Sequence, residues 1–222
     1  MAGFSGGRKT VCPGLSSLET IKDFHGYKFL SDPEVRAAKL KGNPCHEESL
    51  SVALLAGVNF SINIVLNSSR QVVKAFAGDM SRSHEQACLY VGKHACPDVR
   101  GPADVVITGC GGYPLDATFY QCTKALVTDL PCVKKSGNII AAGSCIEGIG
   151  SETYRDMLFR YSGNFSRFLD HIKNSGSVIK DQWQIQMQAR VDFLIGRENV
   201  SFYTHGVAHT DGGSLGVTAI CC

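Results

Sequence analysis

The sequence lacks long apolar runs and has no strong excess of charge of one sign. No stretch approaches the roughly 18 consecutive apolar residues of a membrane-spanning helix, and Met1 leads into glycines instead of the basic, apolar leader of a signal peptide. The net charge is only +2 over 222 residues, with basic and acidic residues interspersed. These absences argue against a membrane protein and against nucleic acid as the main partner. We expect a cytoplasmic protein.

The sequence also lacks any C-x-x-C pair, although it contains ten cysteines. Most of them lie in apolar segments predicted to be strands or helices, so we expect mainly buried free thiols in a reducing compartment. One cluster has residue types that zinc accepts, namely His84, Cys88, His94 and Cys96. Its spacing matches no standard zinc site.

The first hundred residues mix helix and strand signals. The stretch SSLE, from Ser16 to Glu19, predicts a capping box that starts a helix with His25 near its end. A second helix is predicted over residues 46–57. Residues 58–79 alternate as a hairpin with a turn at NSSR, and residues 80–93 form another amphipathic helix.

The second half has a cleaner pattern. Residues 103–110 predict a buried strand, residues 117–127 a helix and residues 138–145 a second buried strand. This βαβ order predicts a parallel sheet. Further helices are expected at 151–161, 164–173 and 181–195, the last one amphipathic, followed by a late strand at 200–204. We therefore expect an α/β fold in two portions, the second with a Rossmann-like parallel-sheet core.

The loop GFSGGRKT, from Gly3 to Thr10, has the composition of an anion-binding loop. Glycines let backbone N–H groups approach a ligand, while Arg8 and Lys9 supply cations. The stretch fits the nucleotide-binding pattern G-x-x-x-x-G-K-[ST] except that Arg8 replaces the second glycine, and no strand precedes it. A degenerate P-loop NTPase and a flexible glycine-rich tail both stay open as alternatives.

A second candidate loop, GGYPLD, follows the first buried strand of the βαβ unit. Ligands of open α/β sheets bind at this edge. In the helix that follows, Tyr120 and Lys124 are four residues apart and share one face, so they can converge on one ligand. The alternative is that both are ordinary surface residues.

Several motifs together resemble the nickel-pincer lactate racemase family and its 2-hydroxy-acid racemase and epimerase relatives. They are GFSGGRK with His25 sixteen residues after Lys9, GGYPLD followed by Tyr120, Gln121 and Lys124, AGSCIEGIGSE, and the late Trp183. The resemblance covers roughly residues 3 to 205 and corresponds to the latter part of the family's length.

The resemblance implies a nickel-pincer mononucleotide cofactor with nickel. In the family, a lysine of the glycine-rich loop holds this pyridinium-derived cofactor through a thioamide, and a histidine on the next helix completes the nickel coordination. These would be Lys9 and His25, while a capping or surface position is the alternative for His25. The cofactor phosphate would be cradled by Ser5, Gly6, Gly7 and Arg8.

The resemblance also implies the reaction, in which hydride leaves C2 of a small 2-hydroxy acid and returns to its other face. Lys124, Tyr120 and Gln121 would hold the substrate carboxylate, and Trp183 would wall the pocket unless it only packs in the core. Residues 1–96 would then be the cofactor-binding remainder of the family's N-terminal domain. Residues 97–103 would be a linker, and residues 104–222 the C-terminal α/β domain.

One family feature has no counterpart in these 222 residues. The two proton-transfer histidines and a substrate-binding arginine of the family lie before the glycine-rich loop. We therefore expect a component that is incomplete alone and that works with an N-terminal half supplied in trans. Proteins that build the cofactor and insert nickel are further expected partners. A non-catalytic nucleotide- or cofactor-binding module is the alternative.

Overall fold

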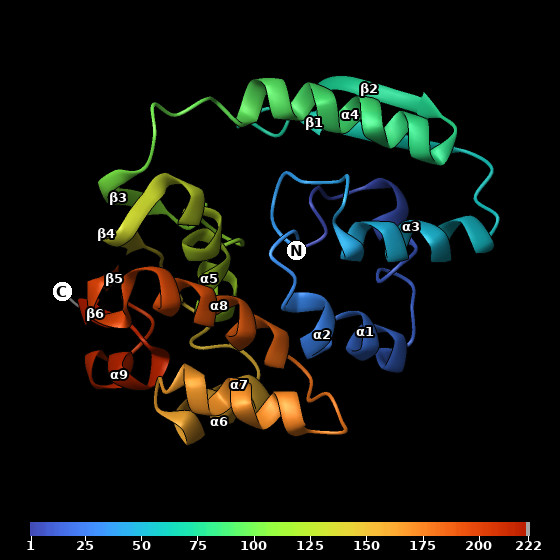
Figure 1. The fold of residues 1–222 in the computed structure, drawn as a ribbon. Coiled ribbons are helices and arrows are strands. Elements are labelled where there is room, and N and C mark those ends of the chain that lie inside the picture. The colour runs from blue at the N-terminus through green and yellow to red at the C-terminus, as the bar shows by residue number, and fades with distance from the viewer. Residues whose placement is uncertain (221–222) are drawn as a thin grey trace. The chain divides into compact units, whose positions relative to one another are not determined.

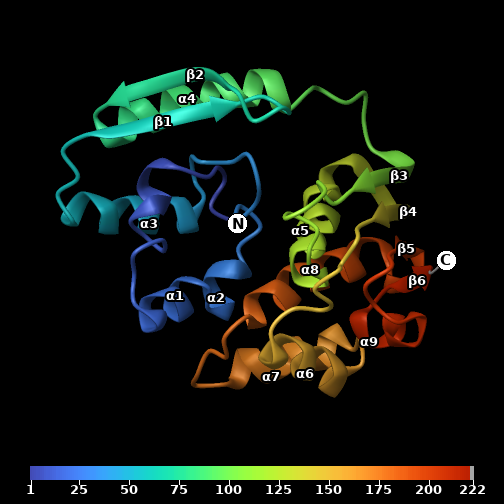
Figure 2. The ribbon, with the colours of Figure 1, turned by 180° about the vertical axis from the view of Figure 1, so that it is seen from behind.

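The computed structural model describes residues 1–220, so Cys221 and Cys222, expected to be thiols, lie outside the described residues. The chain divides into two compact units, Met1–Asp98 and Val99–Cys222. Figures 1 and 2 show the elements of each unit from opposite sides.

The first unit combines short helices with one antiparallel hairpin. Its elements are the 3₁₀ turn η1 (Gly7–Thr10), α1 (Leu18–Phe24), α2 (Tyr27–Leu30), α3 (Pro44–Leu55), β1 (Ser61–Leu66), β2 (Val72–Gly78) and α4 (Met80–Ala95). The predicted hairpin is confirmed, and Asn67 closes its turn by accepting the Gln71 N–H at 2.9 Å. Helix α4 packs along the hairpin.

Helix caps explain where the helices of this unit begin. The Asn43 side chain accepts N–H groups at the start of α3, where Pro44 has no N–H to satisfy. For α1 the capping residue is Ser17, which accepts the Thr20 N–H, and not Ser16 as the SSLE pattern predicted. The Ser16 hydroxyl instead donates to the carbonyl of Val11, which keeps it in the preceding turn.

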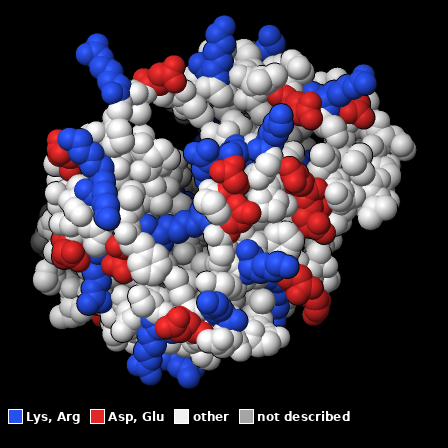
Figure 3. Space-filling view, viewed as in Figure 1, with Lys and Arg blue, Asp and Glu red and all other residues white. Residues whose placement is uncertain are grey.

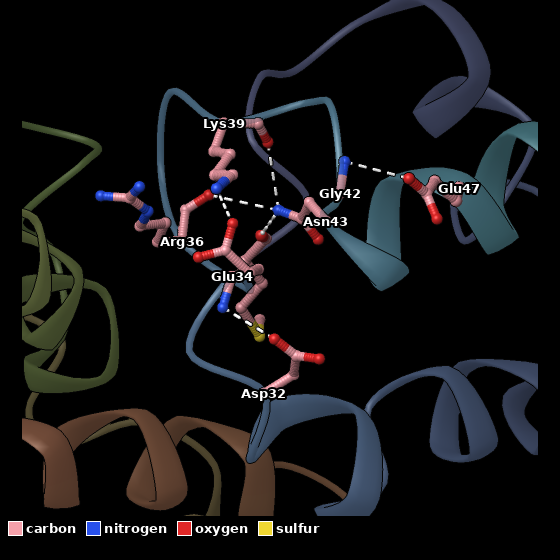
Figure 4. Close-up of polar contacts among 8 residues, drawn as sticks. Asp32, Glu34, Arg36, Lys39, Gly42, Asn43 and Glu47 are labelled. Carbon is pink, nitrogen blue, oxygen red and sulfur yellow. Dashed lines mark hydrogen bonds and ion pairs between the residues drawn. The ribbon is translucent and has the colours of Figure 1, made fainter.

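The segment between α2 and α3 is held to the start of the chain by polar contacts. The Asn43 amide donates to the carbonyls of Met1 at 2.8 Å and of Lys39 at 3.1 Å. An ion pair joins Lys39 to Glu34, and these side chains point toward one another in Figure 4. The first residues of the chain are therefore tied down, which they would not be in a flexible glycine-rich tail.

The second unit is the predicted α/β portion. Its elements are β3 (Ala103–Gly109), α5 (Phe119–Thr128), η2 (Leu130–Cys132), β4 (Val133–Ala142), α6 (Glu152–Tyr161), α7 (Phe165–Asn174), α8 (Gln182–Ile195), η3 (Arg197–Asn199), β5 (Val200–Tyr203), η4 (His209–Asp211), α9 (Gly212–Leu215) and β6 (Thr218–Ile220). Strand β4 begins at Val133, earlier than the predicted Asn138, and β6 and α9 were not predicted.

The four strands form one parallel sheet in the order β3-β4-β5-β6. The predicted α/β class with a βαβ core is confirmed, with α5 joining β3 to β4. In register, Ile107 pairs with Ile140, and Ala141 with Phe202. Alternate residues of β4 and β5 are buried, so one face of the sheet belongs to the core.

Helices α5 and α8 pack together over this buried face. Phe119 of α5 meets Phe202 of β5 edge to face, with ring centroids 5.3 Å apart and both side chains fully buried. Helix α8 differs from the expected amphipathic helix, because its glutamines are buried together with its apolar residues. Gln184 donates to Thr123, and Gln188 donates to the Leu215 carbonyl at 2.6 Å. Hydrogen bonds thus allow a polar sequence to lie in the core.

The structure also places the cysteines and the charged side chains. Six cysteines are buried free thiols, namely Cys12, Cys45, Cys88, Cys110, Cys122 and Cys145, whereas Cys96 is exposed. Basic and acidic side chains are interspersed over the face in Figure 3. Within residues 1–220, no helix combines the length and apolar character that crossing a membrane requires.

Phe202→Ala tests the core of the second unit. We expect the free energy of unfolding of this unit to fall by about 3–5 kcal/mol, because the change opens a cavity beneath Phe119. Trp183 is the only tryptophan, so its fluorescence in a urea titration follows this unit. Phe193→Ala is the control, since Phe193 is 56% exposed; equal losses in both variants would contradict this packing.

Candidate functional site

The glycine-rich loop is shaped by close packing at its glycines. Gly7 has φ +53°, and a Cβ there would lie 2.5 Å from the ring of His84. Gly3 has φ +75°, and a Cβ there would collide with the Lys39 carbonyl. Any side chain would therefore clash at these two positions. The glycines are required by the fold of the loop itself.

Arg8 differs from the expectation that it faces a phosphate. Its side chain is only 1% exposed, and it donates to the carbonyls of Ala2, Phe4 at 3.1 Å and Gly6 at 3.5 Å. The reason is that the curled loop points its carbonyls inward, where a buried guanidinium with five N–H groups can satisfy several of them. Arg8 therefore holds the loop instead of being displayed to a ligand.

Two residues from other elements support the loop, a role that the sequence analysis assigned to neither of them. Asn63 on β1 accepts the Gly7 N–H at 2.9 Å. His84 on α4 donates from Nε2 to the Ser5 carbonyl at 2.9 Å, and the Arg8 guanidinium lies 3.2 Å from the same nitrogen. Both are far from the loop in sequence, so no local pattern could identify them.

Lys9 and His25 both belong to the first unit, and both have lowered pKa values. The exposed Lys9 has its pKa lowered by partial loss of water and by the neighbouring Arg8 cation. Burial lowers the pKa of His25, its bond to Ile21 opposes this, and the Lys9 ammonium lowers it further. His25 therefore stays neutral, as a metal ligand must be.

The tautomer of His25 is set by the backbone. Its Nδ1 lies 2.7 Å from the Ile21 carbonyl, an acceptor, so Nδ1 carries the hydrogen. The lone pair is then on Nε2, which is the arrangement of most metal-binding histidines. His25 is also the C-cap residue of α1, so the capping position and a ligand role are compatible.

The structure supports neither the candidate zinc cluster nor the P-loop alternative in the first unit. Among residues 1–220, no three or more His, Cys, Asp or Glu side chains are gathered as a metal-ligand group, so the structure does not bring His84, Cys88, His94 and Cys96 together as one. The loop follows an isolated bridge at Gly3 instead of a strand and leads into a 3₁₀ turn, which disfavours a P-loop.

A groove of about 930 Å³ lies between the loop, β1 and α4, but neither Lys9 nor His25 lines it.

The second unit brings four predicted residues together on α5 and α8. The Trp183 indole donates to the Tyr120 hydroxyl at 2.9 Å. The Lys124 ammonium donates to the Gln121 amide oxygen and lies 5.5 Å from the centre of the Tyr120 ring. Trp183 is buried, Tyr120 and Gln121 are half-buried, and Lys124 is exposed. A continuous chain of contacts thus runs from the core to an exposed cation.

Tyr120 stays protonated in this arrangement. Burial raises its pKa, the Trp183 bond lowers it, and the charge of Asp181 raises it. Its ring meets Tyr154 edge to face, with centroids 5.1 Å apart. A phenol that accepts the indole N–H and keeps its own hydrogen can donate to an anion beside Lys124.

The start of α5 is fixed by the loop after β4. The N–H groups of Phe119 and Tyr120 donate to the carbonyls of Gly148 and Ile149, both at 3.0 Å. Asp116, also buried, accepts the Ser144 N–H at 3.0 Å. Loop 143–150, which contains most of the AGSCIEGIGSE motif, therefore orients the helix that carries Tyr120 and Lys124.

Comparisons with known proteins find one family. Residues 1–38 match the lactate racemase N-terminal domain, and residues 99–205 match the lactate racemase C-terminal domain. Lactate racemase from Thermoanaerobacterium thermosaccharolyticum is 36% identical over 192 residues, which is 86% of this chain and 45% of that protein. Lactate racemase from Lactiplantibacillus plantarum is 35% identical over 193 residues, again 86% and 45% of the two proteins.

A solved structure agrees with these matches. The lactate racemase apoprotein from Thermoanaerobacterium thermosaccharolyticum has a TM-score of 0.85 and 32% sequence identity, covering 98% of this chain and 52% of that chain. The chain thus spans about half the length of the relatives it matches.

Gly7→Ala tests the packing of the loop. Its side chain would displace His84, so we expect the amides of residues 3–12 to exchange hydrogen about tenfold faster or more, measured by mass spectrometry. Gly57→Ala is the matched control, because Gly57 also has positive φ, +71°, but nothing lies within 4 Å of its Cβ position. Unchanged loop exchange in Gly7→Ala would contradict this structure of the loop.

Proposed function

Because this chain belongs to the lactate racemase family, we propose that it supplies the cofactor-holding loop and the substrate-carboxylate site of a 2-hydroxy-acid racemase or epimerase. The family's nickel-pincer mononucleotide, when bound, supplies the acceptor and donor for the C2 hydride of the substrate. The match of residues 1–38 and 99–205 to the two lactate racemase domains is the observation that carries this proposal.

The residues of the first unit fit that cofactor. Lys9 offers an exposed amine with a lowered pKa, the property that a covalent attachment point needs. His25 offers a neutral imidazole whose Nδ1–H faces the Ile21 carbonyl, so that Nε2 carries the lone pair with which a histidine binds a metal. Ser5 and Gly6 lie in the same loop, where backbone N–H groups can meet a phosphate. The Gly7 N–H is instead held by Asn63, and Arg8 keeps the loop curled.

The residues of the second unit fit a small 2-hydroxy acid. The Lys124 ammonium binds the carboxylate, and the protonated Tyr120 hydroxyl donates a second hydrogen bond to it. Gln121 holds Lys124 in place through its amide oxygen. Trp183 fixes the orientation of Tyr120 and excludes water from its inner side.

Proton transfer to and from the substrate hydroxyl calls for general bases outside these motifs. The remaining histidines of the chain are His46, His84, His94, His171, His205 and His209. Of these, His84 is engaged with the glycine-rich loop, and His94 is bonded to the Tyr90 carbonyl. We propose that the bases come from the part of the racemase fold without a counterpart in this chain, together with partners that build the cofactor and insert nickel.

A paired substitution tests the cofactor roles. The protein is made in a host that builds the nickel cofactor, and intact mass and nickel content are measured. We expect Lys9→Arg to lose the covalent adduct, because the guanidinium keeps the charge but cannot form the thioamide. We expect His25→Ala to keep the adduct and lose most of its nickel, because the imidazole is the protein's metal ligand.

Lys22→Arg is the matched control for Lys9, since Lys22 is a half-buried lysine on α1. An adduct that persists in Lys9→Arg would reject the attachment point. Full nickel content in His25→Ala would reject the ligand.

Complementation tests the proton-transfer proposal. Loss of one general base typically lowers the rate by about 10²–10⁴-fold, so we expect the cofactor-loaded 222-residue chain alone to racemise D-lactate at near-background rates. Adding the N-terminal half of the Thermoanaerobacterium enzyme should restore turnover, and Lys124→Ala should abolish the restored activity. Chiral chromatography of lactate and larger 2-hydroxy acids measures both. Full activity of the chain alone would show that its own histidines move the protons.

A further inference from the structure

The second face of the parallel sheet is bare and apolar. Because side chains alternate along a strand, the residues that do not face α5 and α8 point to the opposite side. Val105 and Ile107 on β3, Ile140 on β4 and Ile220 on β6 are 48%, 79%, 40% and 43% exposed. The register places Ile107 directly beside Ile140. We call Val105, Ile107, Ile140 and Ile220 the open sheet face.

Topology explains why this face is bare. The strands advance in one direction, β3-β4-β5-β6, and all neighbours are parallel. Parallel connections are right-handed in nearly all proteins, so strands that advance in one direction carry their crossover helices on the same side. The burial of Ile139, Ala141 and Phe202 marks that covered side. Among residues 99–220, nothing covers the other side enough to bury Ile107.

The chemistry of the open sheet face is that of an interface. The other positions with the same orientation on the central and far strands are Asn138, Ala142, Ser201, Tyr203 and Thr218. None of the residues on this side, from Val105 to Ile220, is charged. Solvent-facing strands normally carry charges that prevent association, and parallel sheets are covered by helices on both faces. The face therefore lacks the features of a surface that stays in water.

We propose that the open sheet face is the docking site of an amphipathic helix from the part of the racemase fold that has no counterpart in these 222 residues. One observation and one general rule favour this occupant over a second copy of the chain. The match to the solved racemase covers 98% of this chain, including the sheet, but only 52% of that protein, so about half of the family's polypeptide is left to supply a cover. An apolar stripe on a helix is also the usual partner of a parallel sheet.

This inference rests on the proposed function, since its occupant is the part of the racemase fold that has no counterpart in this chain. It adds the place on the second unit at which that part docks. The expected effect of one substitution is large, because burying an isoleucine side chain changes an association constant by about tenfold to a hundredfold.

The test is co-purification. The tagged chain is co-expressed with the remaining sequence of the Thermoanaerobacterium enzyme, outside the matched 192 residues. We expect Ile107→Asp and Ile140→Asp to reduce the co-purified fragment about tenfold or more. Leu55→Asp is the matched control, because Leu55 is an 88% exposed aliphatic residue of the first unit, and it should leave the yield unchanged. Hydroxyl-radical footprinting should show Ile107 protected only in the complex.

Further measurements distinguish the proposed docking from misfolding and from association of two copies of the chain. Ile107 is exposed in the chain alone, so Ile107→Asp should leave the thermal unfolding followed by Trp183 fluorescence unchanged. Co-purification that Ile107→Asp and Ile140→Asp do not weaken would overturn the inference, as would the absence of any complex. A wild-type dimer of about twice 23.9 kDa that Ile107→Asp dissociates would assign the face to a second copy. A complex that depends on Ile107 but shows no racemisation would reject the proposed function alone.

Discussion

The carbonyl groups of Ala2, Phe4 and Gly6 converge on the buried guanidinium of Arg8, and the geometry of the glycine-rich loop depends on this contact. A cation without water is costly unless its N–H groups are satisfied, and each hydrogen bond to a charged group contributes about 1.5–3 kcal/mol. Carbonyls of the loop offset part of this cost by accepting from the two terminal nitrogens of Arg8, whereas its buried Nε has no hydrogen-bond partner among the described residues. Curling around Arg8 requires positive φ at Gly3, Gly6 and Gly7 and turns the next side chain, Lys9, outward to an exposed position.

The curled shape of the loop also depends on contacts with α4 and β1. His84 fills the space that the missing Cβ of Gly7 leaves, and Asn63 receives the Gly7 N–H. Asn63 is itself held by Ser83 at 3.1 Å. The hairpin and α4 therefore act as a support for a short loop at the start of the chain. Residues of β1 and α4 thus decide how the candidate attachment point is presented.

In the second unit, hydrogen bonds between loop 143–150 and the residues just before α5 support the candidate site. The Glu147 N–H donates to the Ala117 carbonyl at 2.8 Å, and the Cys145 N–H donates to the Asp116 carbonyl at 2.9 Å. Thr204, after β5, holds the same loop by donating to the Ser144 carbonyl at 3.1 Å. The ends of three strands are thereby joined to the start of α5. This is the edge where open α/β sheets bind ligands, and it orients the helix that carries Tyr120 and Lys124.

The sequence alone determined the α/β class, the hairpin and the βαβ unit, because these depend on local periodicity. The candidate residues followed from the resemblance of its motifs to those of the racemase family. Tyr120 and Lys124 share a helix face through helical spacing alone. The tertiary structure decided which way Arg8 points, that His84 and Asn63 support the loop, and that Trp183 bonds Tyr120. The contacts of His84, Asn63 and Trp183 join residues about 55 to 80 positions apart, so no local pattern encodes them. The carbonyls that accept from Arg8 lie only two to six positions away, and the curl of the loop, which α4 and β1 support, turns them inward. The open sheet face is likewise decided by the tertiary structure, because the two faces of a strand differ only when its neighbouring strands and helices are in place.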